Sequence, residues 1–164
     1  GVTLITLYTM SSVYHGLRPG MAKKVMQVLD HCTIYFLIAG SYTPILLVAM
    51  RPKYPALAWV LFGIVWGCAI IACALTAIDL KKYSVFSMIC YLAMGWTIIF
   101  FIKQTYEVMS LGGVIFLVAG GVAYTVGSIL YGLGKTKKWM HSIFHIFILA
   151  GSILHFFAII LYAL

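Results

Sequence analysis

Charged side chains are scarce in this sequence, and acidic ones are nearly absent, with 3 Asp and Glu residues among 164. Charged residues make up 9 % of the chain and hydrophobic residues 64 %, and the mean hydropathy is +1.09. A soluble domain of this length buries one core and needs a charged surface around it, which this composition does not provide. The composition therefore excludes an ordinary soluble domain and predicts a protein that lies in a lipid bilayer.

The sequence also lacks paired cysteines and a recognisable leader. Its four cysteines stand inside apolar runs without a CxxC pair, which predicts small core residues: Cys32, Cys68, Cys73 and Cys90. The apolar sequence starts directly at Gly1, without an initiator Met or a basic stretch followed by a cleavage site. We therefore interpret the chain as part of a longer protein and not as one that starts with a signal peptide.

Long apolar runs dominate what remains. A helical span needs roughly 20 apolar residues to cross a hydrocarbon core about 30 Å thick. Six segments meet this description, with approximate limits 1–17, 29–50, 56–78, 83–102, 111–133 and 141–164. The strict alternation of a transmembrane barrel is missing, and no soluble domain fits between the segments. The prediction is an all-α, polytopic transmembrane helical bundle formed by residues 1–164 as a single domain, with six helices visible of seven and the first one upstream.

Lys and Arg residues sit in short clusters between the apolar runs, which argues against a nucleic-acid partner and for loops beside a membrane. The first, third and fifth loops hold eight of them: Arg18, Lys23, Lys24, Lys81, Lys82, Lys135, Lys137 and Lys138. The second and fourth loops hold three: Arg51, Lys53 and Lys103. Because Lys and Arg in short loops stay on the inner side, the eight-residue side is expected to be cytoplasmic. The expected location is the cell inner (plasma) membrane, with both ends of the visible chain outside.

Glycines are frequent within the spans and predict close helix packing. They include Gly63 and Gly67 in a GxxxG pattern, and the series Gly112, Gly113, Gly120, Gly121 and Gly127. Packing within one chain is favoured over a dimer motif, because GxxxG is common in such helices. No oligomeric state is assigned.

His141 and His145 are four residues apart near the start of the last span. On a helix this spacing places both rings on one face, about one turn from each other, where they can chelate a metal ion. The intervening residues lack the acid of the HExxH signature, so the metalloprotease mechanism does not apply. By itself the pair fits a metal site or ring hydrogen bonds between helices.

Two further polar residues stand at the same membrane face. His15 ends the first visible span on the basic side, and Asp30 starts the second there. Three imidazoles and a water molecule form the shell of a catalytic zinc site, and a nearby carboxylate can hold or deprotonate that water. Ser11 precedes His15 by one turn, and its hydroxyl serves either a bound water or substrate or its own helix.

Several other polar, aromatic and proline residues are weaker candidates for a functional role. His31 is expected to point away from Asp30, since it lies about 100° around the helix. His155 lies about 15 Å deeper than His145 and is expected to be a buried hydrogen-bonding histidine. Pro44 is expected to loosen the second visible helix. Four aromatic residues fit either a lipid pocket or ordinary packing: Tyr35, Tyr42, Trp96 and Tyr124.

Four motifs in one order resemble hemolysin III, the bacterial branch of the progestin and adiponectin receptor (PAQR) family. They are SSVYH at 11–15, DHCTIY at 30–35, GSYTP at 40–44 and HSIFH at 141–145. The resemblance covers essentially the whole chain, and the combination of SxxxH, a later Asp and a terminal HxxxH carries it.

The resemblance implies a seven-helix bundle with a cytoplasmic N-terminus. It also implies a Zn²⁺ ion held by His15, His141 and His145, with Asp30 and Ser11 around a bound water. The related receptors and the similar alkaline ceramidases suggest hydrolysis of a lipid amide.

Three functions stay open at this point. The first is a zinc-dependent intramembrane hydrolase of a lipid amide or ester, with Asp30 as general base and Ser11 beside it. The second is a pore-forming hemolysin or channel, although the spans show no polar stripe that would line a pore. The third is a lipid receptor or sensor in which the zinc is structural. The motifs leave the identity of the lipid open.

Overall fold

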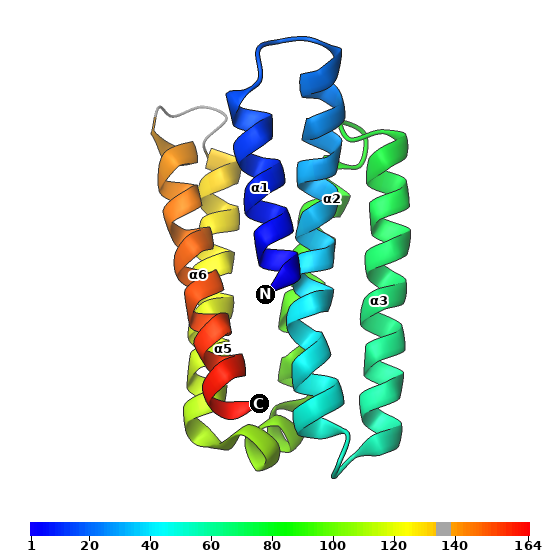
Figure 1. The fold of residues 1–164 in the computed structure, drawn as a ribbon, viewed down its shortest axis with the longest axis vertical. Coiled ribbons are helices and arrows are strands. Elements are labelled where there is room, and N and C mark those ends of the chain that lie inside the picture. The colour runs from blue at the N-terminus through cyan, green and yellow to red at the C-terminus, as the bar shows by residue number, and fades with distance from the viewer. Residues whose placement is uncertain (134–138) are drawn as a thin grey trace.

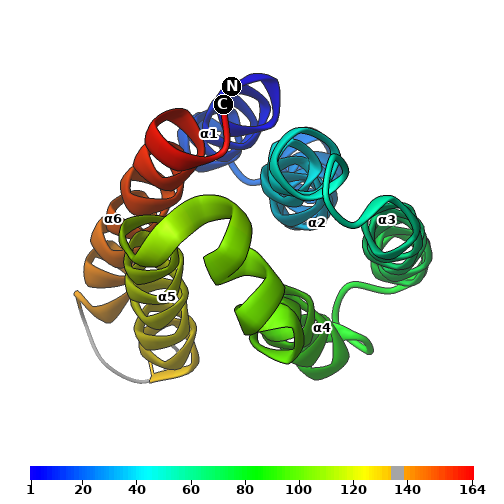
Figure 2. The same cartoon turned by 90° about the horizontal axis from the view of Figure 1, so that it is seen from below.

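The computed structural model describes residues 1–133 and 139–164, and these residues form helices without any β-strand. The α-helices are α1 (Val2–Gly16), α2 (Met21–Pro44), α3 (Pro55–Ile78), α4 (Ser84–Trp96), α5 (Ile102–Leu133) and α6 (Met140–Tyr162). They run alongside one another (Figure 1) and follow one another around a ring, so that α6 comes to lie near α1 (Figure 2). The prediction of an all-α polytopic bundle is confirmed.

Four helical stretches of the described residues are long and apolar enough to cross a membrane: Met21–Met50, Pro55–Ile78, Ser84–Leu133 and Met140–Tyr162. The six predicted segments differ from these for two reasons. The helix α1 has 15 residues, which is short for a span. The stretch Ser84–Leu133 has 50 residues and is kinked at Ser110, whose φ of 59° and ψ of 175° are not helical. It therefore combines two of the predicted segments (Figure 2).

Large apolar side chains cover the outside of the bundle. On α3, Val60, Ile64 and Ile71 are 57 %, 51 % and 64 % exposed. A soluble protein would hide side chains of this kind, whereas hydrocarbon tails solvate them without cost. The exposed apolar surface agrees with the membrane assignment made from composition.

The second membrane stretch changes its helical form after Pro44. A proline has no backbone N–H, and its ring crowds the preceding turn. From Ile45 to Met50 the chain continues as a π-helix, in which the Arg51 N–H donates to the carbonyl of Leu46 at 2.9 Å. The expectation that Pro44 loosens this helix is confirmed.

The glycines of α5 allow α6 to approach closely. A Cβ atom added to Gly113 would lie 2.9 Å from the Cβ of Tyr162, and one added to Gly127 would lie 3.2 Å from Ile148. Any larger residue at Gly113 would push the helices apart. The prediction of close packing is confirmed for this pair of helices.

The GxxxG pattern of α3 behaves differently. A Cβ atom added to Gly63 or Gly67 would meet no described residue within 4 Å. The preference for packing of these two glycines within the chain was wrong, because this face of α3 points away from the bundle. The neighbouring Cys68 is exposed, so the prediction of a core position was wrong for it as well, whereas Cys32 is buried.

The connections at the two ends of the bundle differ in how many basic residues they carry. Arg18, Lys23 and Lys24 stand in or beside the α1–α2 connection, and Lys81 and Lys82 stand in the α3–α4 connection at the same end (Figure 1). Three further lysines of the predicted cytoplasmic side, Lys135, Lys137 and Lys138, lie outside the described residues.

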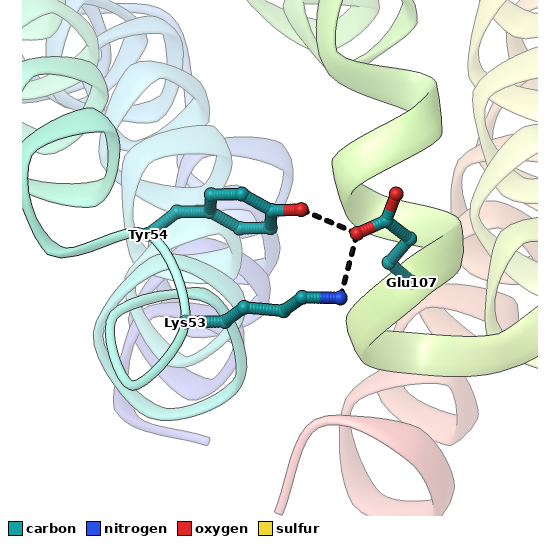
Figure 3. A network of polar contacts seen from close by, with 3 residues as sticks. All are labelled: Lys53, Tyr54 and Glu107. Carbon is teal, nitrogen blue, oxygen red and sulfur yellow. Dashed lines mark hydrogen bonds and ion pairs between the residues drawn. The ribbon is translucent and has the colours of Figure 1, made fainter.

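At the other end, Lys53 Nζ lies 2.6 Å from Glu107 Oε2, and the hydroxyl of Tyr54 donates to the same oxygen (Figure 3). This ion pair joins the α2–α3 connection to the first turns of α5. Residues 103–107, expected to form a loop, are helical here and precede the turn at Ser110.

Candidate metal centre

Three histidines from opposite ends of the sequence meet at the basic end of the bundle. His15 stands in the last turn of α1, and His141 and His145 stand in the first turns of α6. One ring nitrogen from each lies within 4.8 Å of the others. The ring centroids are 5.2 Å apart for His15 and His141, 5.2 Å for His15 and His145, and 4.7 Å for His141 and His145. No other group of three such donors occurs in residues 1–133 and 139–164.

The donor set and its geometry fit a zinc ion. Zinc takes imidazole nitrogens at about 2.0–2.1 Å in tetrahedral geometry, which places two of its nitrogen ligands roughly 3.4 Å apart. The Nε2 atoms of His141 and His145 are 3.1 Å apart, close to this separation. Three imidazoles leave one position of a tetrahedron open, as in catalytic zinc sites. The ion and the three ligands stay a prediction.

Asp30 lies beside the histidines. Its carboxylate lies close enough to His31, His15 and His141 to interact with them electrostatically. Ser11 is one turn before His15 on α1, so both side chains lie on the same face of that helix. Ser11 lines the same cavity as His15 and Asp30, and the role of its hydroxyl stays a prediction.

A cavity of about 280 Å³ begins at these polar groups and continues into the bundle. Its polar end includes Ser11, His15, Asp30, His141 and His145. Its walls are mostly apolar and include Leu37, Ile38, Ile45, Leu117 and Ile148. A space of this shape suits a molecule with a polar head and an apolar chain.

His31 also borders the cavity, but its Nδ1 lies 2.8 Å from the carbonyl oxygen of Gln27 on its own helix. Deeper in the bundle, the Nε2 of His155 lies 3.1 Å from the carbonyl oxygen of Leu117, which agrees with the buried hydrogen-bonding histidine expected there.

The four aromatic residues considered as pocket walls divide into two groups. Tyr42, Trp96 and Tyr124 line the cavity. Tyr35 does not line it, because it is fully buried between helices and its hydroxyl lies 3.2 Å from Thr76 Oγ1. The periodicity of α2 alone does not separate Tyr35 from Tyr42, since both face other helices.

Two tyrosines beside the histidines were not found by sequence reasoning. The ring of Tyr14 lies 4.7 Å from that of His15, and the ring of Tyr131 lies 6.1 Å from that of His141. Tyr14 stands directly before His15 in the sequence, which is a usable signal. Tyr131 comes from α5 and has no motif around it, so only the packing of α5 on α6 reveals it.

The sequence matches the family model described as "Haemolysin-III related" over residues 1–156. "Hemolysin-3" of Bacillus cereus is 38 % identical over 164 residues, which cover 100 % of this chain and 73 % of that protein. The "Hemolysin-3 homolog" of Bacillus subtilis is 36 % identical over 162 residues, or 99 % of this chain and 74 % of that protein.

The human "Monocyte to macrophage differentiation factor" is 26 % identical over 167 aligned residues, covering 97 % of this chain and 66 % of that protein. No solved structure shows a significant match. These similarities confirm the resemblance inferred from the four motifs, and they agree with a multi-pass membrane protein. With its family model matched over almost the whole chain, this protein belongs to the haemolysin III related family.

Proposed function

We propose that this membrane protein is a zinc-dependent hydrolase that cleaves an amide or ester bond of a lipid at the cytoplasmic face of the membrane. The observation that carries the proposal is the meeting of three imidazole nitrogens within 4.8 Å of one another, with a carboxylate beside them, at the polar end of an apolar cavity.

The residues divide the work by their chemistry. His15, His141 and His145 would hold the zinc ion, which would supply Lewis acidity for a carbonyl oxygen and for a water molecule. Asp30 has no place among the three imidazole ligands and serves as general base, accepting the proton of the attacking water. Ser11 would donate its hydroxyl hydrogen to the Asp30 carboxylate and so orient it.

The cavity supports a lipid substrate more than a soluble one. A chain lying between residues such as Ile38, Leu117 and Ile148 would be surrounded by apolar atoms, while its carbonyl lay at the histidines. The basic residues of the α1–α2 and α3–α4 connections support a cytoplasmic position for the polar end. A substrate would therefore arrive from the inner leaflet.

The deciding experiment combines metal analysis of the purified full-length protein with mass spectrometry of the lipids that copurify with it. We expect about one zinc per chain and hydrolysis of an amide or ester lipid. His141→Ala combined with His145→Ala should abolish both, whereas His31→Ala, which removes an imidazole bonded to its own helix, should keep the zinc. Absence of stoichiometric zinc, or zinc retained by the double variant, would overturn the proposal.

Pore formation is a second candidate function, because the Bacillus relatives are named as hemolysins, and it has its own test. If this chain lyses membranes by forming a pore, liposomes that contain it should leak dye whether or not zinc is present. A lipid sensor with structural zinc would instead bind a lipid and never cleave it. Turnover and leakage therefore separate the three functions.

A further inference from the structure

Three hydroxyl groups from three helices meet deep in the bundle, far from the candidate metal centre. The hydroxyl of Tyr8 on α1 donates to Ser152 Oγ on α6 at 2.9 Å. The hydroxyl of Tyr124 on α5 lies 2.8 Å from the same Ser152 oxygen. Ser152 is 3 % exposed, so this contact is inside the protein.

Counting hydrogen atoms shows that this group has a donor to spare. Each of the three hydroxyls carries one hydrogen, and the two contacts with Ser152 use two of the three. Whether Tyr124 donates to Ser152 or accepts from it, one hydrogen has no acceptor among residues 1–133 and 139–164. That hydrogen can be donated to a bound molecule.

His155 supplies a matching acceptor. A carbonyl oxygen only accepts, so the contact between His155 Nε2 and the Leu117 oxygen at 3.1 Å requires a hydrogen on Nε2. In the neutral ring Nδ1 then carries a lone pair, for which no donor is found in the described part of the chain. Every fully buried side-chain nitrogen or oxygen described has a partner. The Nδ1 of His155 is therefore open to the adjoining cavity.

Two glycines hold these rings in place. A Cβ atom added to Gly151 on α6 would lie 2.9 Å from ring carbons of Tyr124, which belongs to α5. A Cβ atom added to Gly120 on α5 would lie 2.6 Å from the Nε2 of His155, which belongs to α6. Each helix thus provides a notch for the aromatic ring of the other. The two rings pack edge to face with centroids 5.2 Å apart.

The position of the group relates it to the candidate metal centre. Tyr8, Tyr124 and His155 line the same cavity as His15, His141 and His145. Tyr124, Ser152 and His155 also line a second cavity of about 280 Å³, which lies between the start of α1 and the end of α6. His155 follows His145 by ten residues on α6, which corresponds to roughly 15 Å along the helix.

We propose that four side chains deep in the bundle bind a hydroxyl group on the hydrocarbon chain of a lipid whose polar head lies at the candidate metal centre. We call them the hydroxyl cluster: Tyr8, Tyr124, Ser152 and His155. A hydroxyl both donates and accepts, so it can satisfy the Nδ1 of His155 and the spare hydrogen of the cluster together. A plain alkyl chain would leave both groups without partners in apolar surroundings, which is unfavourable. The inference rests on the proposed function, because that function places the polar head of the lipid at the zinc site.

The test compares 12-hydroxyoctadecanoic acid with octadecanoic acid as probes of the zinc-loaded full-length protein in detergent. Its hydroxyl, about a dozen carbons from the carboxylate, suits the roughly 15 Å between the two sites. We expect the hydroxylated acid to bind about five- to tenfold more tightly, as one or two hydrogen bonds to neutral groups allow. An isomer hydroxylated at carbon 2 should show no such gain.

Variants locate the preference. His155→Phe, which removes the acceptor, should bring the two affinities to within about twofold of each other, and should leave the affinity for octadecanoic acid nearly unchanged. If His155→Phe fails to fold, the combination of Tyr8→Phe, Tyr124→Phe and Ser152→Ala removes all three hydroxyls and serves instead. Tyr106→Phe, which removes a hydroxyl from an exposed residue outside the cavity, should keep the preference.

Equal affinities of the wild type for the two acids would overturn the inference, as would no binding of the hydroxylated acid or a preference that survives both the loss of His155 and the loss of the three hydroxyls. The readout is a ratio of two binding constants and needs no turnover. Loss of zinc or of hydrolysis, which would defeat the proposed function, is measured separately.

Discussion

His141 and His145 stand one helical turn apart on α6, with their Nε2 atoms 3.1 Å from each other. As the proposed zinc ligands, these two imidazoles and that of His15 from α1 would each contribute to the affinity for the ion. We expect His15→Ala, His141→Ala and His145→Ala each to lower zinc affinity by more than the roughly 100-fold that loss of an outer-shell partner costs. Titration with a competing chelator measures this. A variant that binds zinc as the wild type does would remove that histidine from the ligand set.

Replacement of Asp30 should separate zinc binding from catalysis. Asp30→Asn keeps the size of the side chain but removes the base, so we expect a loss of about 10²–10⁴ in kcat with zinc content unchanged. Ser11→Ala should cost less, because it removes only the proposed hydrogen-bond donor to the carboxylate and leaves the base in place. Asp79→Asn, at the end of α3, is the matched control and should be fully active. Full activity of Asp30→Asn would show that another group accepts the proton.

Tyr42 should contribute to stability through its hydroxyl. That group donates to the carbonyl of Gly95 at 2.9 Å and accepts from the Ile98 N–H at 3.0 Å, so it joins α2 to the end of α4. Tyr42→Phe would leave both partners unpaired in the core, at a cost of about 1–3 kcal/mol. Thermal unfolding in detergent, compared with Tyr106→Phe, measures the loss. Equal unfolding midpoints for the two variants would argue against this role.

The ion pair at the far end should matter less and should depend on pH. The hydrogen bond from Lys53 to Glu107 raises the pKa of Lys53, and the bond from Tyr54 to Glu107 raises the pKa of Tyr54. For both groups the protonated form is favoured in the folded protein. Their contribution is therefore complete below the ordinary values of 10.5 and 10.0 and is lost as the pH rises through the raised values.

Glu107→Gln tests this contribution. At about pH 8 we expect its melting midpoint to lie below that of the wild type by less than about 3 °C, because exposed ion pairs stabilise little. The difference should shrink at strongly alkaline pH. A difference that stays constant or grows there would mean that Glu107 acts through something other than Lys53 and Tyr54.

The sequence by itself determined that the chain lies in a membrane and that two of the candidate zinc ligands, His141 and His145, share one face of a helix. The apolar content of the chain requires lipid, and the roughly 20-residue length of its apolar runs requires membrane-spanning helices. The spacing of His141 and His145 places both rings on one face of α6, because the helical period is 3.6 residues. His15 and Asp30 were expected at the same depth, since each stands at a basic end of an apolar run.

Only the tertiary structure decided which of these groups touch. That the end of α1 lies against the start of α6 follows from side-chain packing around the whole bundle, which no local pattern encodes. The same holds for the kink at Ser110 within an apolar stretch and for the hydroxyl cluster. Tyr8 and Ser152 are separated by 144 positions in the sequence and carry no motif. They meet because the glycines of α5 and α6 let the last two helices pack closely and α1 lies beside them.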